Sequence, residues 1–433
     1  MPTPRPVLDS QPQIARGEET APHVVYVCNP PWMGGAEEFL VRLITTVKQV
    51  GWRTTLILPD RPHLQSVVER LQGIGAQVLA TQVKTERDYL IPALLHLADV
   101  PQRTWLKRTL QELAPDIVHV NQPIAESAQL ALQAAASLHL PVVTTVHQYK
   151  SVLVRGHKLA RLRDAVIDWH YRNVQTISLP VARAATVLEQ QYPRTRGKTW
   201  IVPPAIDVDL FNPERVAPRT PIVRARLDPA GDQLLVGVVA RLAKEKGQRA
   251  LLAVWPRIRQ RIPHAQLILA GDGPDRQTLE ELCRNLRIKD SVTLLGHVPP
   301  QGIPELLSAL DVVVQPSFHE CLPLAMLEAM VMRRAVIATA VDAIPDVLTH
   351  ESAGIIVPPA DADALADAVV RLLDDRELAD RLGRQAQRIV LERFTPGEQL
   401  RQVFAFYERI LSCPHSAVER GTIHVEAVSR RLY

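Results

Sequence analysis

Short, continuous apolar runs recur along the chain and alternate with stretches of helical periodicity. The first run, Val24–Cys28 (V-V-Y-V-C), has no charged position, which is typical of a strand buried on both faces of a parallel sheet. Similar runs predict strands at Thr54–Leu58, Gln77–Val83, Asp116–Val120, Val142–Val146, Ala185–Leu188 and Trp200–Val202. Segments between them, such as Gln65–Leu71 and Ala125–Leu138, predict helices. This alternation predicts a doubly wound parallel sheet.

A second series of the same kind follows. Its predicted strands are Leu234–Ala240, Gln266–Ala270, Val292–Leu295, Asp311–Gln315, Ala335–Ala340 and Gly354–Val357. Its predicted helices are Gln248–Arg261, Arg276–Leu286, Ile303–Ala309, a helix opened by Pro323, Ala364–Leu373 capped by Asp361 or Asp363, Glu377–Glu392 and Pro396–Leu411. The sequence therefore predicts an α/β fold with two Rossmann-like, doubly wound parallel-sheet domains facing each other across a cleft.

The domain boundaries follow from these two series. Residues 22–203 form the predicted N-terminal domain, and residues 220–395 form the predicted C-terminal domain. The proline-containing residues 204–219 between them break the periodicity and are predicted as a linker. The helix at 396–412 could cross back to the N-terminal domain, 1–21 reads as a disordered lead-in, and 413–433 as a tail without apolar periodicity.

Composition excludes several classes of protein. The 433 residues include 50 basic and 46 acidic side chains, a mixed surface that does not indicate nucleic-acid binding. The four cysteines show no C-x-x-C spacing, so neither a zinc site nor a disulfide framework is predicted. The sequence shows no secretory signal and no apolar run of the roughly 18 residues that a membrane span needs. A cytoplasmic location is expected.

The stretch Ser317–Glu328 (S-F-H-E-C-L-P-L-A-M-L-E) carries the most informative candidate chemistry. Pro323 is tolerated at the first position of a helix, so Glu320 is predicted on the preceding loop and Glu328 in the second helical turn. The free N–H groups of the first turn favour a phosphate, and the two carboxylates could hold different hydroxyls of one ligand. Alternatively, Glu320 is simply an acid near a helix start and Glu328 faces water.

Further candidates lie where strands end, which is where doubly wound sheets bind ligands. Gly34 and Gly35 precede a helix, His147 follows a buried strand, and Arg241 and Lys246 flank a strand-to-helix turn where two cations could clamp a diphosphate. Each has a plain alternative: an ordinary tight turn, polar lining, or solvated cations.

Two other features are weaker. The stretch 150–172 carries seven basic residues and could contact an anionic membrane surface, such as the inner membrane face, although charged faces are usually solvated. Asp207 and Asp209 form a D-x-D pattern, which can hold a metal at a strand end. Because they lie in the linker, they are predicted to be structural, and no metal is expected.

Several short motifs follow one another along Val24–Leu411. They are G-G-A-E, P-D-I-V-H-V, T-T-V-H, A-I-D-V-D-L-F-N-P, R-L-A-K-E-K-G, A-G-D-G-P, L-G-H-V, D-V-V-V-Q-P-S and the glutamates that enclose P-L-A-M-L-E-A-M. Together they resemble the family of retaining, nucleotide-sugar-dependent glycosyltransferases often called family four of the B-type fold. In that family, Arg241 and Lys246 match the diphosphate clamp, Glu320 the contact to donor sugar hydroxyls, and Glu328 the ribose contact.

The resemblance assigns the other candidates as well. The backbone at Leu322 and Leu324 matches the phosphate-facing helix start. His147 matches the histidine that faces the donor sugar from the N-terminal domain, and Gly34 and Gly35 match the loop that closes over phosphate and acceptor.

The same resemblance predicts the activity. His297 and Val298 match the segment beside the nucleotide base. The implied reaction transfers a hexose from a nucleotide-sugar donor to a hydroxyl acceptor, which could be a polysaccharide, a lipid-linked sugar or a small molecule. Anomeric configuration would be retained by same-face attack, with the leaving phosphate taking the acceptor proton. Neither a metal nor a separate cofactor is expected.

The chain also departs from the family pattern. Cys321, Arg333 and Ala240 stand where the family usually has glycine, and Asp342 and Ala343 replace a Gly-Gly pair. Asp342 should narrow the donor loop or add a polar contact to the donor, and its charge is unfavourable there unless it is paired. These changes either retune donor choice or mark a degenerate site, which leaves a non-catalytic sugar-nucleotide-binding or scaffold protein as an alternative. A sugar-nucleotide epimerase of the same fold is a third hypothesis.

Overall fold

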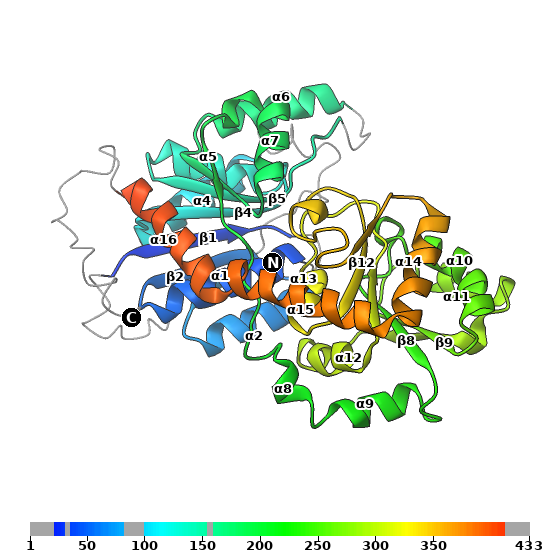
Figure 1. The fold of residues 1–433 in the computed structure, drawn as a ribbon. Coiled ribbons are helices and arrows are strands. Elements are labelled where there is room, and N and C mark those ends of the chain that lie inside the picture. The colour runs from blue at the N-terminus through cyan, green and yellow to red at the C-terminus, as the bar shows by residue number, and fades with distance from the viewer. Residues whose placement is uncertain (1–20, 31–34, 82–98, 154–158, 412–433) are drawn as a thin grey trace, which may run out of the picture.

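The computed structural model describes residues 21–30, 35–81, 99–153 and 159–411. They form two lobes, each built on a parallel sheet with helices on both faces (Figure 1). The predicted α/β fold with two Rossmann-like domains is therefore confirmed. Gly34, the tail 413–433 and the lead-in up to residue 20 lie outside the described residues, as do Arg155, His157 and Lys158 of the basic stretch.

The N-terminal sheet has seven strands in the order β3-β2-β1-β4-β5-β6-β7, all paired in parallel. Its strands are β1 His23–Cys28, β2 Arg53–Pro59, β3 Gln77–Thr81, β4 Ile117–Ile124, β5 Val142–Gln148, β6 Thr176–Leu179 and β7 Thr199–Ile201. Its helices are α1 Gly35–Gln49, α2 Gln65–Gly73, α4 Val100–Leu113, α5 Gln129–Ser137, α6 Ala160–Tyr171 and α7 Ala182–Gln191. Alternate residues of β1 enter different cores: Val24 and Tyr26 pack toward α1 and α2, and Val25 and Val27 toward α4 and α5.

The C-terminal sheet has six parallel strands in the order β10-β9-β8-β11-β12-β13. Its strands are β8 Leu234–Val239, β9 Ala265–Ala270, β10 Val292–Gly296, β11 Val312–Gln315, β12 Ala335–Thr339 and β13 Ile355–Val357. Its longer helices are α9 Thr220–Leu227, α10 Gln248–Arg261, α11 Arg276–Asn285, α12 Ile303–Ala309, α13 Leu324–Val331, α14 Ala362–Asp374 and α15 Arg376–Arg393, and a short α8 spans Pro213–Val216 in the linker region. Asp361 caps α14, where its carboxylate accepts the Ala364 N–H at 2.9 Å.

One sequence prediction in the N-terminal domain is wrong. Ala185–Leu188 is part of α7 rather than a strand, and the strand that the sequence reading overlooked is β6. Ala184 and Leu188, four residues apart, are buried on one face of the helix, which is a helical period. The overlooked strand, T-I-S-L, carries two hydroxyl side chains that interrupt the apolar run, yet all four residues are buried.

Helix α16 (Pro396–Leu411) leaves the C-terminal domain and packs across the first sheet (Figure 1). Its Tyr407 is fully buried there and lies in hydrogen-bond contact with His119 of β4 at 2.6 Å and with Tyr26 of β1 at 3.2 Å. Burial lowers the pKa of His119 to about 3, so this imidazole is neutral around pH 7. The crossing helix therefore ties the two domains together through a buried polar contact.

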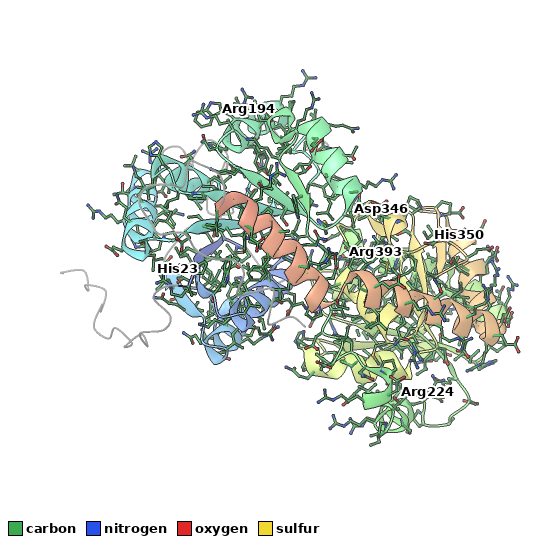
Figure 2. All side chains as sticks on the ribbon, turned by 60° about the vertical axis from the view of Figure 1, so that its left-hand side comes forward. His23, Arg194, Arg224, Asp346, His350 and Arg393 are labelled. Atoms are coloured by element: carbon green, nitrogen blue, oxygen red, sulfur yellow. The ribbon has the colours of Figure 1, made fainter. Side chains whose placement is uncertain are left out.

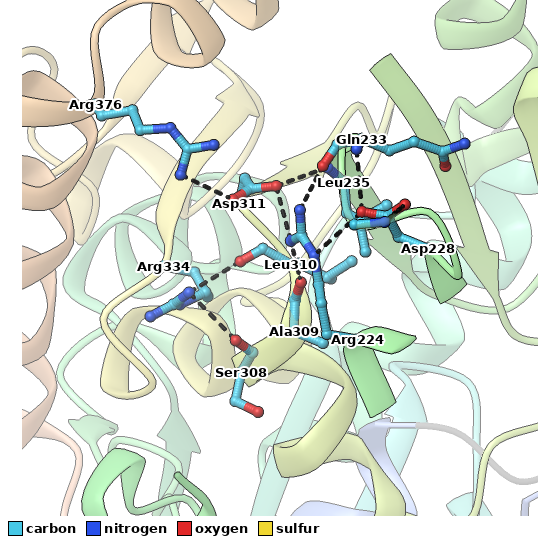
Figure 3. Close-up of polar contacts among 11 residues, drawn as sticks. Arg224, Asp228, Gln233, Leu235, Ser308, Ala309, Leu310, Asp311, Arg334 and Arg376 are labelled. Atoms are coloured by element: carbon cyan, nitrogen blue, oxygen red, sulfur yellow. Dashed lines mark hydrogen bonds and ion pairs between the residues drawn. The ribbon is translucent and has the colours of Figure 1, made fainter. Parts of the chain in front are cut away.

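A polar cluster fastens α9 to the amino-terminal ends of the C-terminal strands (Figure 3). Arg224 donates to the Ala309 carbonyl at 2.7 Å and pairs with Asp311 at 2.9 Å, and Asp311 accepts the Leu235 N–H at 2.7 Å. This cluster lies at the opposite end of the strands from their carboxyl ends. We therefore assign it a structural role.

Candidate active site

Two of the cavities that the described residues form between the domains contain predicted site residues, beside the carboxyl ends of the strands. The first, of about 400 Å³, is lined from the N-terminal domain by the start of α1 and by His147, and from the C-terminal domain by Arg241, Lys246 and Glu320. The second, of about 690 Å³, is lined by α1 residues, by Val298 and by Glu328. Glu320 and Glu328, the two carboxylates predicted to hold one ligand, thus line different cavities of the same interdomain cleft.

Glu320 is the acceptor at the centre of a polar cluster. Its Oε1 atom lies 2.6 Å from Lys246 Nζ and also accepts hydrogen bonds from Gln315 (2.9 Å) and Ser317 (2.8 Å). The Glu320 side chain is only 7% exposed. Charge-assisted hydrogen bonds of this kind fix a carboxylate in one orientation. The Glu320–Lys246 pair, drawn from two different strand ends, is therefore preformed at the cavity wall.

The turn that carries Lys246 reaches this position because glycine follows it. Gly247 has φ +73°, and a Cβ placed on it would lie 1.8 Å from the Pro316 carbonyl oxygen. A hydrogen bond joins the same two segments, because the Phe318 N–H donates to the Glu245 carbonyl at 2.8 Å. Only glycine fits such a close approach. The K-E-K-G spacing thus docks the lysine turn against the end of β11.

The start of α13 also faces the first cavity. Met326 makes the first hydrogen bond of this helix, donating to the Pro323 carbonyl at 3.1 Å, so the backbone amides of Leu324 and Ala325 precede the intrahelical ladder. Leu322, Leu324 and Ala325 all line the cavity. Pro323 lies one residue before the helix rather than at its first position, as its N-cap. The helix start is thus oriented to accept an anion.

Arg241, the other cation of the predicted clamp, lines the same cavity and is partly exposed. It forms an ion pair with Glu245 of the following turn, and its carbonyl accepts a hydrogen bond from Gln248 at 2.9 Å. Arg241 and Lys246 therefore line the same cavity.

Glu328 has an unexpected partner from the other domain. Its Oε1 atom lies 2.7 Å from Arg42 Nη2 of α1, and Arg42 also donates to the Ala205 carbonyl of the linker at 2.8 Å. Burial raises the pKa of the Glu328 carboxyl, an effect that Arg42 partly offsets. Glu328 therefore does not face bulk water, and Arg42 joins α1, the linker and α13.

His147 closes the first cavity from the N-terminal side. Its Nε2 lies 2.8 Å from the side-chain oxygen of Asn121, and its ring packs edge-on against Phe39. Because the Asn121 amide nitrogen points toward the Ala36 carbonyl (3.4 Å), the Asn121 oxygen accepts the Nε2 proton and leaves Nδ1 as an acceptor. Burial lowers the pKa of His147 to about 3, so the ring is neutral around pH 7.

Asp342 occupies a special position behind the cavity wall. Its φ of +46° explains why glycine would suit this position, and Arg333, at φ +58°, stands at another such point after α13. The Asp342 carboxylate accepts the Glu320 N–H at 2.8 Å and pairs with Lys150 at 2.8 Å. It is not among the residues that line these two cavities, and the donor contact predicted for Asp342 stays a prediction.

The other departures from the family pattern have separate surroundings. The Cys321 side chain lines the first cavity, and burial, with the nearby Asp342 and Glu320 carboxylates, raises the pKa of its thiol. The thiol therefore stays protonated and is not a nucleophile. Arg333 bonds to Gln387 (2.7 Å) and pairs with Glu214 (2.8 Å), outside the lining of both cavities.

The remaining predicted residues are placed as follows. Gly35 begins α1 and lines the first cavity, with no atom within 4 Å of a Cβ placed on it. Val298 lines the second cavity, whereas His297 is exposed. Asp207 accepts the backbone N–H groups of Asp209 (3.1 Å) and Leu210 (2.9 Å), which gives it the turn-forming role expected from its place in the linker.

Several residues of the site escaped the sequence reading. Asn121 had a usable signal, because a polar residue near the end of a central strand is a candidate by the same rule that selected His147. Gln315 and Ser317 also lie at a strand end, beside Glu320. Arg42 had no such signal, since it lies inside an amphipathic helix and its partner is far away in the sequence.

Comparison with known proteins agrees with this arrangement. Residues 33–210 match the family model "Glycosyltransferase Family 4" and residues 220–389 match "Glycosyl transferases group 1". Alpha-D-kanosaminyltransferase from Streptomyces kanamyceticus is 30% identical over 282 residues, 62% of this chain and 71% of that protein. The 2-deoxystreptamine N-acetyl-D-glucosaminyltransferase from Streptomyces fradiae is 28% identical over 80% of this chain and 84% of its own length.

The solved structures agree on the fold. HepE from Anabaena, in complex with UDP, superimposes with a TM-score of 0.74 at 19% identity, covering 89% of this chain and 100% of that chain. At this identity, the likeness concerns the fold alone. The matched ranges 33–210 and 220–389 together include the cleft residues His147, Arg241, Lys246, Glu320 and Glu328. The chain therefore belongs to glycosyltransferase family 4 and is a nucleotide-sugar glycosyltransferase.

Proposed function

We propose that this chain transfers a hexose from a nucleotide-sugar donor to a hydroxyl acceptor with retention of anomeric configuration. The observation that carries the proposal is the cavity that holds Lys246, Arg241 and Glu320 beside the start of α13. A diphosphate needs cations and backbone N–H groups, and a sugar needs a fixed carboxylate for its hydroxyls. All three are present within one cavity of about 400 Å³.

In this proposal, the donor extends through both cavities. The diphosphate lies against Lys246, Arg241 and the first turn of α13, with the sugar hydroxyls on Glu320. The ribose contacts Glu328, and the base lies near Val298 in the larger cavity. Neutral His147 accepts a hydrogen bond from a sugar hydroxyl through Nδ1, because Nε2 already donates to Asn121.

The chemical step breaks the bond between the anomeric carbon and the diphosphate oxygen. Negative charge then grows on the leaving diphosphate, where the two cations and the helix N-terminus stabilise it. The acceptor hydroxyl attacks the same face of the sugar that the diphosphate leaves, and its proton passes to a diphosphate oxygen. Because Lys246 and Arg241 supply positive charge at the leaving group, we propose that no divalent metal takes part.

Glu320 is not proposed as a covalent nucleophile. Its Oε1 atom is already bound to Lys246, Gln315 and Ser317, which stabilises the carboxylate as a hydrogen-bond acceptor and reduces its nucleophilicity. This argument favours same-face attack by the acceptor over a glycosyl-enzyme intermediate of the kind that retaining glycosidases form.

The first experiment is a thermal-shift screen over UDP-, GDP- and ADP-sugars with EDTA present, since a true donor raises the melting temperature by mass action. UDP-sugars come first, because UDP is bound in the HepE structure. Turnover of the best donor is then compared among wild type, Glu320→Ala and Lys246→Ala. Equal rates in all three would refute the site, binding without turnover over an acceptor panel would favour a scaffold, and donor conversion without acceptor would favour an epimerase.

We also propose that the acceptor is presented at a membrane surface that contacts the face around α6. Leu159, Leu162 and Trp169 are exposed there by 55%, 47% and 40%, and the exposed Arg172 lies over the Trp169 ring at 3.6 Å. An apolar face with nearby cations suits an anionic interface. Co-sedimentation with phosphatidylglycerol vesicles but not phosphatidylcholine vesicles is expected for wild type and lost in Leu162→Asp; equal sedimentation would contradict the proposal.

A further inference from the structure

An ion pair crosses the cleft beside the loop that bears Glu320. Lys150 follows β5 of the N-terminal domain, and its Nζ lies 2.8 Å from the Oδ1 atom of Asp342, which follows β12 of the C-terminal domain. Both side chains are mostly buried, with exposures of 24% and 11%. A pair that is largely removed from solvent is weakly screened by salt, so it holds its two segments together more firmly than a surface pair.

The same two side chains also bond to the loop, at His319 and at Glu320. The other oxygen of Asp342, Oδ2, accepts the backbone N–H of Glu320 at 2.8 Å. Lys150 Nζ in turn donates to Nδ1 of His319 at 3.0 Å. One carboxylate thus bonds simultaneously to a cation of the N-terminal domain and to the backbone of the residue that faces the donor sugar.

The backbone at Asp342 adopts a conformation that favours glycine. Its φ is +46°, in the left-handed region, which is strained for most side chains and which Asp adopts more readily than most. An unpaired carboxylate close to a diphosphate would also repel the donor. Lys150 removes that repulsion by pairing with Asp342, and the Glu320 N–H occupies the second oxygen. Asp342 does not line the first cavity, and its hydrogen bond to the cavity wall is the one to Glu320.

We propose that Lys150 and Asp342 form a clasp that holds the Glu320 loop against the N-terminal domain and so sets the position of the sugar subsite. Both are positioning residues rather than catalytic residues. This inference rests on the function proposed above, because it assigns Glu320 to the donor sugar.

The clasp predicts different effects on the affinity for a nucleoside diphosphate and on the affinity for the complete nucleotide sugar. A nucleoside diphosphate contacts Lys246, Arg241 and the start of α13, none of which bonds to Lys150 or Asp342. When the clasp is broken, its affinity should therefore change less than that of the nucleotide sugar, and only through the charge left unpaired. The complete nucleotide sugar also contacts Glu320, so its affinity should fall when the clasp is broken. A looser cleft should also admit water, raising the ratio of donor hydrolysis to sugar transfer.

The experiment compares three variants of the full chain with wild type. Lys150→Gln removes the cation, Asp342→Asn keeps an acceptor for the Glu320 N–H but removes the charge, and Lys150→Arg is the conservative rescue. The matched control is Arg194→Gln, which breaks the Arg194–Asp168 pair (2.6 Å) within the N-terminal domain; Asp168 is 12% exposed, close to the 11% of Asp342. Arg194 lies at the far end of that domain, away from Asp346 and Arg393 at the domain junction (Figure 2).

Three quantities are measured: hydrogen exchange of the Glu320 amide in the free chain, dissociation constants for UDP, GDP and ADP and for their sugars, and the hydrolysis-to-transfer ratio. For Lys150→Gln and Asp342→Asn, we expect faster exchange, a higher ratio, and a loss of nucleotide-sugar affinity about tenfold larger than any loss of nucleoside diphosphate affinity. Lys150→Arg should restore wild-type values, and Arg194→Gln should match them.

Two results would overturn the clasp. In the first, Lys150→Gln and Asp342→Asn have the same exchange rate of the Glu320 amide and the same nucleotide-sugar affinity as Arg194→Gln. The other is an equal loss of affinity for the diphosphate and for its sugar, which would indicate a general loss of structure. If wild type binds no nucleotide sugar, the proposed function fails, whereas the exchange of the Glu320 amide still decides whether the clasp holds the loop.

Discussion

Replacing Lys246 with methionine removes a cation from the first cavity while keeping the length of the side chain. In the free protein, the ammonium lies 2.6 Å from Glu320, and both groups are mostly buried. Glu320 retains the hydrogen bonds from Gln315 and Ser317. The loss of stability should therefore lie between that of an exposed and a buried pair, about 1–3 kcal/mol.

The catalytic effect of Lys246→Met should exceed its effect on stability. A preorganised donor that stabilises the charge of a leaving group contributes about 10²–10³ in kcat, or roughly 3–4 kcal/mol. Lys244 provides a matched control, because it lies in the same turn and is exposed outside the cavity lining.

The assay is nucleoside diphosphate release at saturating donor, with kcat and KM determined for wild type, Lys246→Met, Lys246→Arg and Lys244→Met. Denaturant melts measure the free energy of unfolding of each variant, so that a loss of folded protein is not mistaken for a lower kcat. We expect Lys244→Met to match wild type and Lys246→Arg to recover part of the lost rate. A kcat for Lys246→Met within twofold of that for Lys244→Met would refute the assignment of Lys246 to the leaving group.

Three further predictions concern other parts of the chain. Glu328→Gln should weaken donor binding by about tenfold or more and abolish discrimination against a 2′-deoxyribose donor, as measured by kcat/KM for the two donors; persistent discrimination would exclude a ribose contact. Burial lowers the pKa of His119 from 6.5 to about 3, so between these two pH values the unfolded chain binds more protons at this residue than the folded chain does. The free energy of unfolding should therefore fall as the pH drops below 6.5, by up to about 1.4 kcal/mol per pH unit for this group. Urea melts of wild type and His119→Asn across that range check this, and an identical slope in both would contradict it. Arg333→Gly should change stability by less than about 1 kcal/mol, because relief of the left-handed backbone offsets the lost contacts to Gln387 and Glu214, and it should leave donor KM unchanged; a raised KM would place Arg333 in the donor site after all.

The sequence predicted most of the framework, because buried parallel strands and amphipathic helices have distinct periodicities. The bounds of the helices at Gln248–Arg261, Ile303–Ala309 and Pro396–Leu411 agree with the prediction to the residue. The error at Ala185–Leu188 arose where a short apolar run in a helix was mistaken for a strand. A run of four residues does not distinguish the two periods.

The candidate site was predictable only within each domain. Strand-end rules and the resemblance selected Glu320, Lys246, Arg241 and His147, and the structure brings them to one cavity. The spacing of residues along the sequence did not predict which side chains pair between the domains. Arg42 and Glu328 are separated by 286 positions, and the charge of Asp342 was recognised as a problem without its partner, Lys150, being identified.

The most direct measurement is an NMR time course of donor hydrolysis by the purified protein, which needs no knowledge of the acceptor. The donor is the α-linked nucleotide sugar that raises the melting temperature most in the thermal-shift screen. If the cleft performs same-face transfer, water replaces the acceptor and the α-anomer of the free sugar appears first, before mutarotation, at a rate that falls sharply in Lys246→Met. Initial release of the β-anomer, or release that Lys246→Met leaves unchanged, would contradict retaining transfer in this cleft.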